Sequence, residues 1–173
     1  MASATLTKST LQSQAYENIN NILNTRTNVA DPKDPNNLSN RKYVYDSDPF
    51  LNSLNTDDFP YLIHGLPEMT SVSHSFNQKV RMLKFKHRII VRTKRVASSS
   101  NVITDRGRTD MNSICDDLIE TFNSVSIKAT LQGYRMNNIK LDKTSTDDLV
   151  VNNQNVYESE YELTYDQRFT VSS

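Results

Sequence analysis

The order of apolar and polar positions predicts two amphipathic helices. In residues 8–24, apolar side chains recur at the spacing of one helical face, so this helix is expected to pack on another element. Its stripe consists of Leu11, Ala15, Ile19, Ile22 and Leu23. Residues 109–123 repeat the pattern, with Thr109 as the expected N-cap residue. The second stripe consists of Met111, Ile114, Leu118 and Phe122.

Alternation with a period of two predicts that most of the remaining chain forms strands. The expected strands are 59–64, a long stretch at 71–95, 125–133, short segments near Ile139 and at 149–151, and 156–171. The stretch at 71–95 is several times longer than a usual strand, so it either includes a hairpin near Asn77 or extends beyond the sheet. Its alternation changes phase at Met82 and Leu83, which indicates a β-bulge or a bend.

Residues 25–58 have a different composition, rich in Asn, Ser and Asp and with three Asp-Pro pairs. Proline fixes its own φ and restricts the residue before it, so these pairs predict a series of turns. A connection of this length is usually functional or disordered. We expect an extended arm that lies on a neighbouring protein, the alternative being an excursion that packs on its own domain. The expected contact residues of the arm are Tyr43, Tyr45, Phe50 and Leu51.

The order of elements indicates the fold class. Consecutive strands without strand–helix alternation favour an α+β fold, an antiparallel sheet of about four to five strands with two helices packed on one face. The length of 173 residues suits a single domain, residues 1–173. Within it we expect the helix at 8–24, the arm at 25–58, and the sheet with its second helix at 59–173.

One stretch of the chain is strongly basic. Residues 79–95, KVRMLKFKHRIIVRTKR, contain eight Lys or Arg and no acidic residue. Basic runs interleaved with apolar residues are typical of phosphate binding. However, Lys and Arg together number 20, as do Asp and Glu, so the whole chain lacks the surplus expected of a protein that grips nucleic acid through its phosphates.

The parity of the charged positions offers another interpretation. On one side of the basic strand stand Lys84, Lys86, Arg88 and Arg92, and on one side of the last strand stand Glu158, Glu160 and Glu162. Opposite charges on paired strands contribute roughly 0.2–1 kcal/mol per pair. The two rows therefore pair within one sheet, or between subunits around a ring, or the basic row is free for nucleic acid.

No catalytic, metal or cofactor signature is present. The histidines His64, His74 and His87 lack the spacing of a zinc site, and three glycines form no phosphate-binding loop. We expect His87 to be a hydrogen-bonded core residue and Cys115 a small buried hydrophobe. The chain is therefore not expected to be an enzyme or to hold a cofactor.

Two further expectations concern partners. Arg106 and Arg108 flank Gly107 in what is expected to be a turn before the second helix, where they would engage an acidic partner. The first residues lead into polar sequence without the apolar core of a signal peptide, and no apolar run approaches the ~20 residues that span a bilayer. We expect a soluble protein of intracellular origin with no membrane partner.

The succession of helix, long connection, FPYLIHGLPE (59–68), basic strand pair, second helix and closing strands resembles the tail terminator or tail-completion proteins of long-tailed bacteriophages. The resemblance implies a homohexameric ring that caps the tail tube, contacts the tube protein and the neck or connector proteins, and lets DNA pass without sequence-specific contacts. It also implies a location in the virion after assembly in the host cytoplasm.

Three alternatives to this family remain open. The arm at 25–58 is longer than such proteins need, which leaves room for another neck or head-completion role. A nucleic-acid-binding module that uses residues 79–95 is the second alternative. The third is a small monomeric accessory factor whose arm folds onto one partner.

Overall fold

The computed structural model describes residues 8–25, 43–48, 59–74, 80–95, 106–151 and 154–170. In these ranges it contains three helices and a six-stranded sheet in the order β1-β2-β4-β6-β5, with β3 also paired to β4. The elements are α1 (Lys8–Thr25), β1 (Val44–Tyr45), β2 (Tyr61–His64), β3 (Glu68–His74), β4 (Val80–Lys94), α2 (Arg106–Asn123), α3 (Val125–Gly133), β5 (Met136–Val151) and β6 (Gln154–Thr170). The fold is broadly α+β, as predicted, but it has one helix and at least one strand more than expected.

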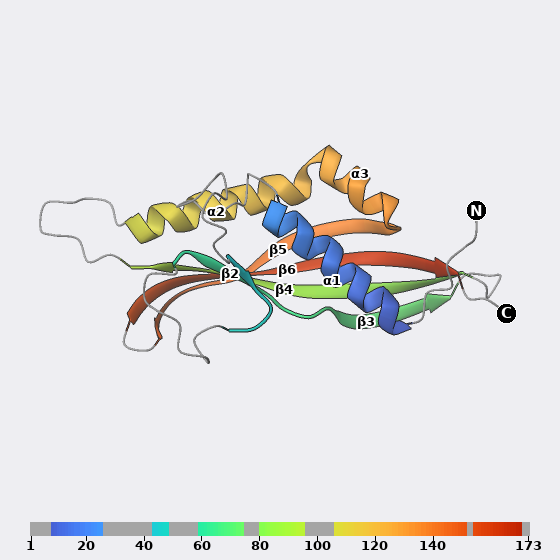
Figure 1. The fold of residues 1–173 in the computed structure, drawn as a ribbon, viewed down its shortest axis with the longest axis horizontal. Coiled ribbons are helices and arrows are strands. Elements are labelled where there is room, and N and C mark those ends of the chain that lie inside the picture. The colour runs from blue at the N-terminus through green and yellow to red at the C-terminus, as the bar shows by residue number, and fades with distance from the viewer. Residues whose placement is uncertain are drawn as a thin grey trace, which may run out of the picture.

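All three helices lie on one face of the sheet (Figure 1). Their apolar stripes and the inward side chains of β4 and β6 form one buried cluster. The helical members of the cluster are Ala15, Ile19, Ile22, Leu23, Met111, Ile114, Cys115, Leu118, Phe122, Ile127 and Leu131. Both predicted helices and their stripes are thus confirmed, except for Leu11, whose side chain lies outside the described part of the structure. None of the described helices has the length and apolarity needed to cross a bilayer.

The centre of the sheet is the long antiparallel pair of β4 and β6. Its register runs without a shift from Val80 opposite Thr170 to Lys94 opposite Val156. Because successive side chains of a strand point to opposite faces, one register fixes the partners of every position on both faces. Odd-numbered residues of β4 such as Phe85 and Ile89 are buried toward the helices, and most even-numbered ones point away from them.

The predicted bulge at Met82 and Leu83 is wrong for β4, since the register with β6 is continuous there. The change of phase arises because Met82 is an apolar residue on the side of β4 that otherwise carries lysines. The hairpin alternative is confirmed, because β3 pairs antiparallel with β4, and the connection between them lies outside the described residues. β2 pairs with β4 as well, so β2 and β3 follow one another along the same edge of β4.

The strand predicted at 125–133 is wrong, since these residues form the helix α3. Ile127 and Leu131 are buried, whereas Val125 is 84% exposed. A separation of four residues returns to the same face of a strand and also to the same face of a helix. The exposure of Val125 and Ala129, at the intervening positions, shows that the helical period applies.

The two short strands expected near Ile139 and at 149–151 belong to one 16-residue strand, β5. β5 pairs antiparallel with β6 and forms the edge of the described sheet. Its register shifts between Asn137 and Lys140 and between Lys143 and Ser145. Because of these irregularities and its many polar residues, the strand lacks the strict alternation from which its full length could be predicted.

The second predicted helix begins earlier than expected. α2 starts at Arg106, so Thr109 lies within the helix and is not its N-cap residue. The first turn of α2 rests directly on the end of β4, where the Thr93 hydroxyl donates a 2.7 Å hydrogen bond to the carbonyl oxygen of Gly107. The absence of a side chain at Gly107 permits this close approach of helix and strand.

A smaller apolar cluster covers one end of the opposite face of the sheet. Its buried members are Phe59, Tyr61, Ile63, Ile90 and Val156, and Tyr45 and Leu149 pack against it. The predicted strand at 59–64 therefore contributes to both faces, because Leu62 belongs to the larger cluster under the helices. Beyond this cluster, the same face of the sheet carries charged side chains.

Candidate functional site

The charged side chains on the face away from the helices come from the two central strands. In the register, Arg92 of β4 is opposite Glu158 of β6, and Arg88 is opposite Glu162. Lys84 stands opposite Asp166. The basic and acidic rows predicted from the sequence thus lie on adjacent strands of one chain and on the same face of its sheet.

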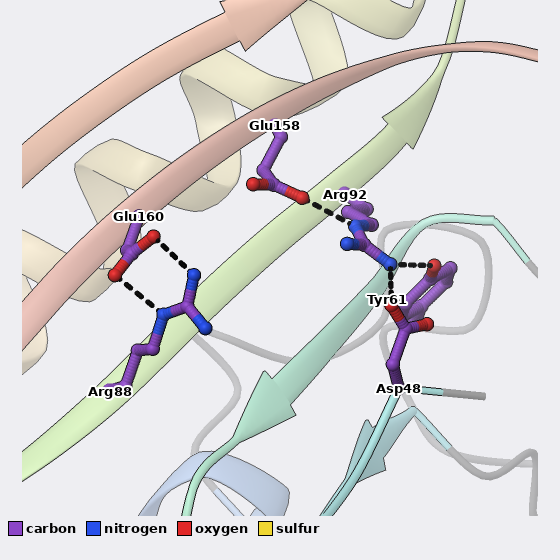
Figure 2. Close-up of polar contacts among 6 residues, drawn as sticks. All are labelled: Asp48, Tyr61, Arg88, Arg92, Glu158 and Glu160. Carbon is purple, nitrogen blue, oxygen red and sulfur yellow. Dashed lines mark hydrogen bonds and ion pairs between the residues drawn. The ribbon is translucent and has the colours of Figure 1, made fainter. Parts of the chain in front are cut away.

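Three ion pairs connect these rows, and we refer to them together as the ion-pair row. The pairs are Lys86 with Glu162 at 3.1 Å, Arg88 with Glu160 at 2.6 Å, and Arg92 with Glu158 at 2.6 Å. The Arg88 contact is bidentate, since Nε and Nη2 donate to the two carboxylate oxygens of Glu160 at 2.6 and 2.7 Å (Figure 2). Bidentate pairs are the most geometrically specific of the ion-pair types.

The pairs at the outer end of the row are open to solvent. The Arg88 side chain is 59% exposed, and Lys86 and Glu162 are also partly exposed. The hydrogen bond from Arg88 lowers the pKa of Glu160, and the bond to Glu160 raises the pKa of Arg88. Because solvent screens exposed pairs, these two pairs contribute little to stability.

The inner end of the row is buried. The side chains of Arg92 and Glu158 are each only 9% exposed. Arg92 Nη1 also donates to Asp48 Oδ2 at 2.7 Å and to the Tyr61 hydroxyl at 3.2 Å, so one guanidinium connects β4, β6, β2 and the segment after β1 (Figure 2). Burial alone would lower the pKa of Arg92, but its hydrogen bonds to Tyr61, Asp48 and Glu158 outweigh that effect and raise it.

This geometry bears on the three interpretations of the charged rows. Lys86, Arg88 and Arg92 each have a carboxylate partner within the chain, as the first interpretation predicts. No second subunit is needed to compensate these charges. The glutamates compensate the positive charge that would attract a phosphate to the strand, which disfavours the nucleic-acid interpretation.

A hollow of about 190 Å³ adjoins the exposed end of the ion-pair row. It is lined by Leu66, Glu68, Lys86, Arg88, Glu160, Tyr161 and Glu162. Both signs of charge face the hollow, and the cations are the ones already paired with Glu160 and Glu162. Three carboxylates and two cations line the hollow, so it presents no surplus of positive charge to an anionic ligand.

The residues predicted to form a contact arm are located differently from the expectation. Tyr43 is buried in the larger apolar cluster, and the strand β1 that follows it pairs in parallel with β2. Tyr45 makes an edge-to-face contact with Tyr61, with ring centroids 5.7 Å apart. For Tyr43 and Tyr45 the alternative of an excursion packed on its own domain is correct. Phe50 and Leu51 lie outside the described residues.

The two arginines predicted to occupy a loop belong to the first turn of α2. The Arg108 guanidinium lies over the Tyr157 ring, 5.5 Å from its centroid, and Arg95 lies 5.9 Å from the same centroid. Cation–π contacts at this distance are weakly stabilising and hold the start of α2 near β6. The side chain of Arg106 is outside the described part of the structure.

A second polar group is buried under α1, and sequence reasoning did not find it as a unit. It consists of Asn20, His64, His87 and Tyr165, which we call the histidine network. His64 Nε2 lies 2.8 Å from His87 Nδ1, and His87 Nε2 lies 2.6 Å from the Tyr165 hydroxyl. Asn20 Oδ1 lies 3.4 Å from His64 Nδ1. Both histidines are fully buried, and His87 is the core histidine that the parity of β4 predicts.

One assignment of protons satisfies the network. With Asn20 Oδ1 as the acceptor, His64 carries its proton on Nδ1 and accepts at Nε2 from the Nδ1–H of His87. His87 Nε2 then accepts from the Tyr165 hydroxyl. Each imidazole holds one proton and is neutral. Burial lowers the pKa of His64 to about 4, and burial together with the charge of His64 lowers that of His87 to about 3.

The sequence contained only part of the signal for this network. His87 lies between the buried Phe85 and Ile89 on its side of β4, and His64 follows the buried Leu62 and Ile63. However, 23 residues separate the two histidines along the chain. Their contact depends on the register of β2 with β4, in which His64 is opposite Ile89. No spacing rule for short motifs detects a pair that is created by strand register.

The described residues contain no group of three or more His, Cys, Asp or Glu side chains that could hold a metal ion. Cys115 is buried and has no disulfide partner. No known protein family matches the chain, and no curated protein is significantly similar to it. The fold, the ion-pair row and the charge balance of the chain are therefore the features that bear on its function.

Proposed function

We propose that the chain is a structural subunit of a long-tailed bacteriophage, a tail terminator whose copies form a closed hexameric ring on the end of the tail tube. In this proposal the ring contacts the tube protein on one side and the neck or connector proteins on the other. DNA passes through it without sequence-specific contacts. The proposal includes no catalytic activity, metal or cofactor.

The ion-pair row is the observation that carries the proposal. The basic strand that most suggests nucleic-acid binding has its charges at Lys86, Arg88 and Arg92 compensated by β6 of the same chain. A protein that lets DNA slide past needs such compensation, because free basic side chains on a surface facing DNA would bind its phosphates. The overall charge balance of the chain agrees with this requirement.

The open sheet supports assembly into a ring. Among the described strands, β5 forms one edge of the sheet, and β1 and β3 lie at the other. Rings arise from heterologous contacts, in which two different surfaces of the same subunit meet. Two unlike sheet edges, each with backbone groups available for pairing, provide such surfaces. The formal net charge of zero means that copies of the chain do not repel one another strongly.

The order of the elements agrees with the resemblance to tail terminators. An N-terminal helix, a long connection, the FPYLIHGLPE segment, a paired basic strand, a further helical segment and closing antiparallel strands occur in that order. The helical segment is a pair, α2 and α3, and the closing strands are the long hairpin of β5 and β6. These similarities support the proposal at the level of architecture.

The test is the assembly state of the purified full-length chain, measured by native mass spectrometry and by electron microscopy of the same sample. We expect a species of six subunits that forms closed rings with a central opening. If the chain assembles only on a tube, the rings should appear at one end of tail tubes purified with it. A chain that stays monomeric and is absent from tube ends would refute the proposal.

A further inference from the structure

The helix α1 is held on the sheet in a different way from the strands beneath it. Backbone hydrogen bonds join β2 to β4 and β4 to β6. Among the described residues, no backbone–backbone hydrogen bond joins α1 to another element. Side-chain contacts therefore hold α1, through its buried stripe of Ala15, Ile19, Ile22 and Leu23 and through the histidine network.

The histidine network lies at the contact between α1 and the sheet. The Tyr16 ring of α1 stacks on His64 with a centroid separation of 4.4 Å and an interplanar angle of 4°. Asn20, one turn further along α1, faces the same imidazole. His64 in turn stacks on His87, with centroids 5.0 Å apart. α1 thus covers two imidazoles that sit on neighbouring strands.

We propose that the histidine network is an acid-sensitive latch: when its imidazoles take up protons, α1 leaves the sheet while β2, β4 and β6 remain paired. The proposal does not depend on the proposed ring function. It follows from the number of protons that the network can hold and from the way in which each element around it is attached.

An additional proton costs the network a hydrogen-bond acceptor. With the other protons in place, a proton added between the rings would set two N–H groups against each other across the 2.8 Å contact of His64 and His87. A proton added at His87 Nε2 would reverse the bond to Tyr165, so that the imidazole donates to the hydroxyl oxygen and the hydroxyl proton loses its acceptor. Either addition leaves a polar hydrogen without an acceptor and a charge in an apolar site, which is strongly unfavourable.

The groups around the imidazoles do not offset that charge. Tyr16 and Asn20 face the network from α1, and Tyr165 faces it from β6. Among the described residues, no carboxylate is hydrogen-bonded to either imidazole. The carboxylate of Asp46, near the end of β1, acts on Tyr16, whose pKa it raises in addition to the effect of burial.

The direction of the pH effect follows from the depressed pKa values of the two histidines. An exposed histidine has a pKa of about 6.5, whereas those in the closed protein are lowered to about 4 for His64 and about 3 for His87. The open form therefore binds more protons than the closed form below pH 6.5. The closed form is favoured above that pH and loses stability as the pH falls toward 4 and then 3.

α1 is the element that can separate from the sheet. Hydration of His64 requires either that the backbone ladder of the sheet opens or that α1 moves away. Moving α1 breaks the Tyr16 stack and the Asn20 contact and exposes one apolar stripe, whereas opening the sheet at His64 breaks the backbone pairing of β2 with β4. The cheaper opening is therefore the departure of α1.

Hydrogen–deuterium exchange of the full chain, read by mass spectrometry from pH 7 to pH 3.5 and corrected for the intrinsic exchange rate, tests the proposal. We expect the protection of 8–25 against exchange to fall about a hundredfold between pH 6.5 and pH 4. Release of α1 with uptake of one proton changes its opening equilibrium tenfold per pH unit. Protection of 80–94 and 154–170 should stay within about threefold. Loss of protection in all three segments together, or retained protection of 8–25 at pH 4, would overturn the proposal.

A matched pair of variants identifies the groups that respond. His64→Gln replaces an imidazole of the network with an amide that can also accept and donate but does not titrate, and His74→Gln makes the same change at the remaining histidine. We expect His64→Gln to shift the release of 8–25 to lower pH by at least about one unit and His74→Gln to leave it unchanged. Release at the wild-type pH in His64→Gln would overturn the assignment. If His64→Gln does not fold, the wild-type exchange data decide alone.

Discussion

Replacing Arg92 with methionine is expected to lower the free energy of unfolding by about 3–5 kcal/mol. Arg92 is buried, and its guanidinium is bonded to Glu158, Asp48 and the Tyr61 hydroxyl. Methionine fills a similar volume but leaves two carboxylates close together at a buried site without their shared cation. Removing one member of a buried pair is far more damaging than removing an exposed pair, since the remaining charge is uncompensated.

The matched control for this variant is Arg88→Met. It makes the same substitution four residues away on the same side of β4, where the side chain is 59% exposed. We expect a loss of no more than about 1 kcal/mol there. Urea unfolding at pH 7 measures both, and similar losses for the two variants would contradict the distinction between the buried and exposed ends of the row.

Replacing Gly107 with alanine is the second change with a large expected effect. A Cβ at this position would lie 2.8 Å from the carbonyl carbon of Lys94 and 3.3 Å from the Cα of Arg95. These are backbone atoms, so no side-chain rotation relieves the clash, and the first turn of α2 must move off the end of β4. We expect a loss of about 1–3 kcal/mol, although helix propensity alone predicts a gain of up to about 1 kcal/mol.

Gly133→Ala is the control, because it makes the same substitution at the end of α3. An added Cβ there meets no atom within 4 Å, and no glycine among the described residues has a positive φ. We expect Gly133→Ala to be neutral or stabilising by up to about 1 kcal/mol. The midpoints of denaturant unfolding, measured with an unchanged m value, give the difference in stability between the two variants. A stabilising Gly107→Ala would show that α2 does not rest on β4 as closely as the structure indicates.

The sequence predicted the central strand pair well because charge and parity gave two independent signals. Glu158, Glu160 and Glu162 share one side of their strand, and Lys84, Lys86, Arg88 and Arg92 share one side of theirs. Only a pairing that brings these sides together compensates both rows, and the structure contains that pairing. The helical stripe of 109–123 was equally clear, since its apolar residues repeat over about three turns.

Prediction failed where one sequence pattern fits two kinds of secondary structure, or where tertiary contacts determine the position of a residue. Ile127 and Leu131 fit a strand or a helix, and only their burial beside exposed Val125 distinguishes the two. Tyr43 sits in a segment of turn-forming residues, yet pairing of β1 with β2 draws it into the core. The contact of His64 with His87 depends on strand register, which the sequence did not specify.

The ion-pair row and the histidine network lie on opposite faces of the same central strand. Arg92 and Arg88 point away from the helices, whereas His87 points toward them. In our account the outer face compensates the charges of Lys86, Arg88 and Arg92, and the inner face controls how α1 is attached. The two features can be tested separately, because different side chains form them.

The central claim is that the charges of the basic strand are compensated within the chain, so that the protein is an assembly subunit and not a reader of nucleic acid. Fluorescence anisotropy of a labelled DNA duplex, titrated with the full chain at low and at physiological salt, tests it most directly. The account predicts binding weaker than about 10⁻⁴ M at physiological salt, the weak limit of nonspecific association. Micromolar binding that falls steeply with salt and disappears in Lys86→Gln/Arg88→Gln would contradict it.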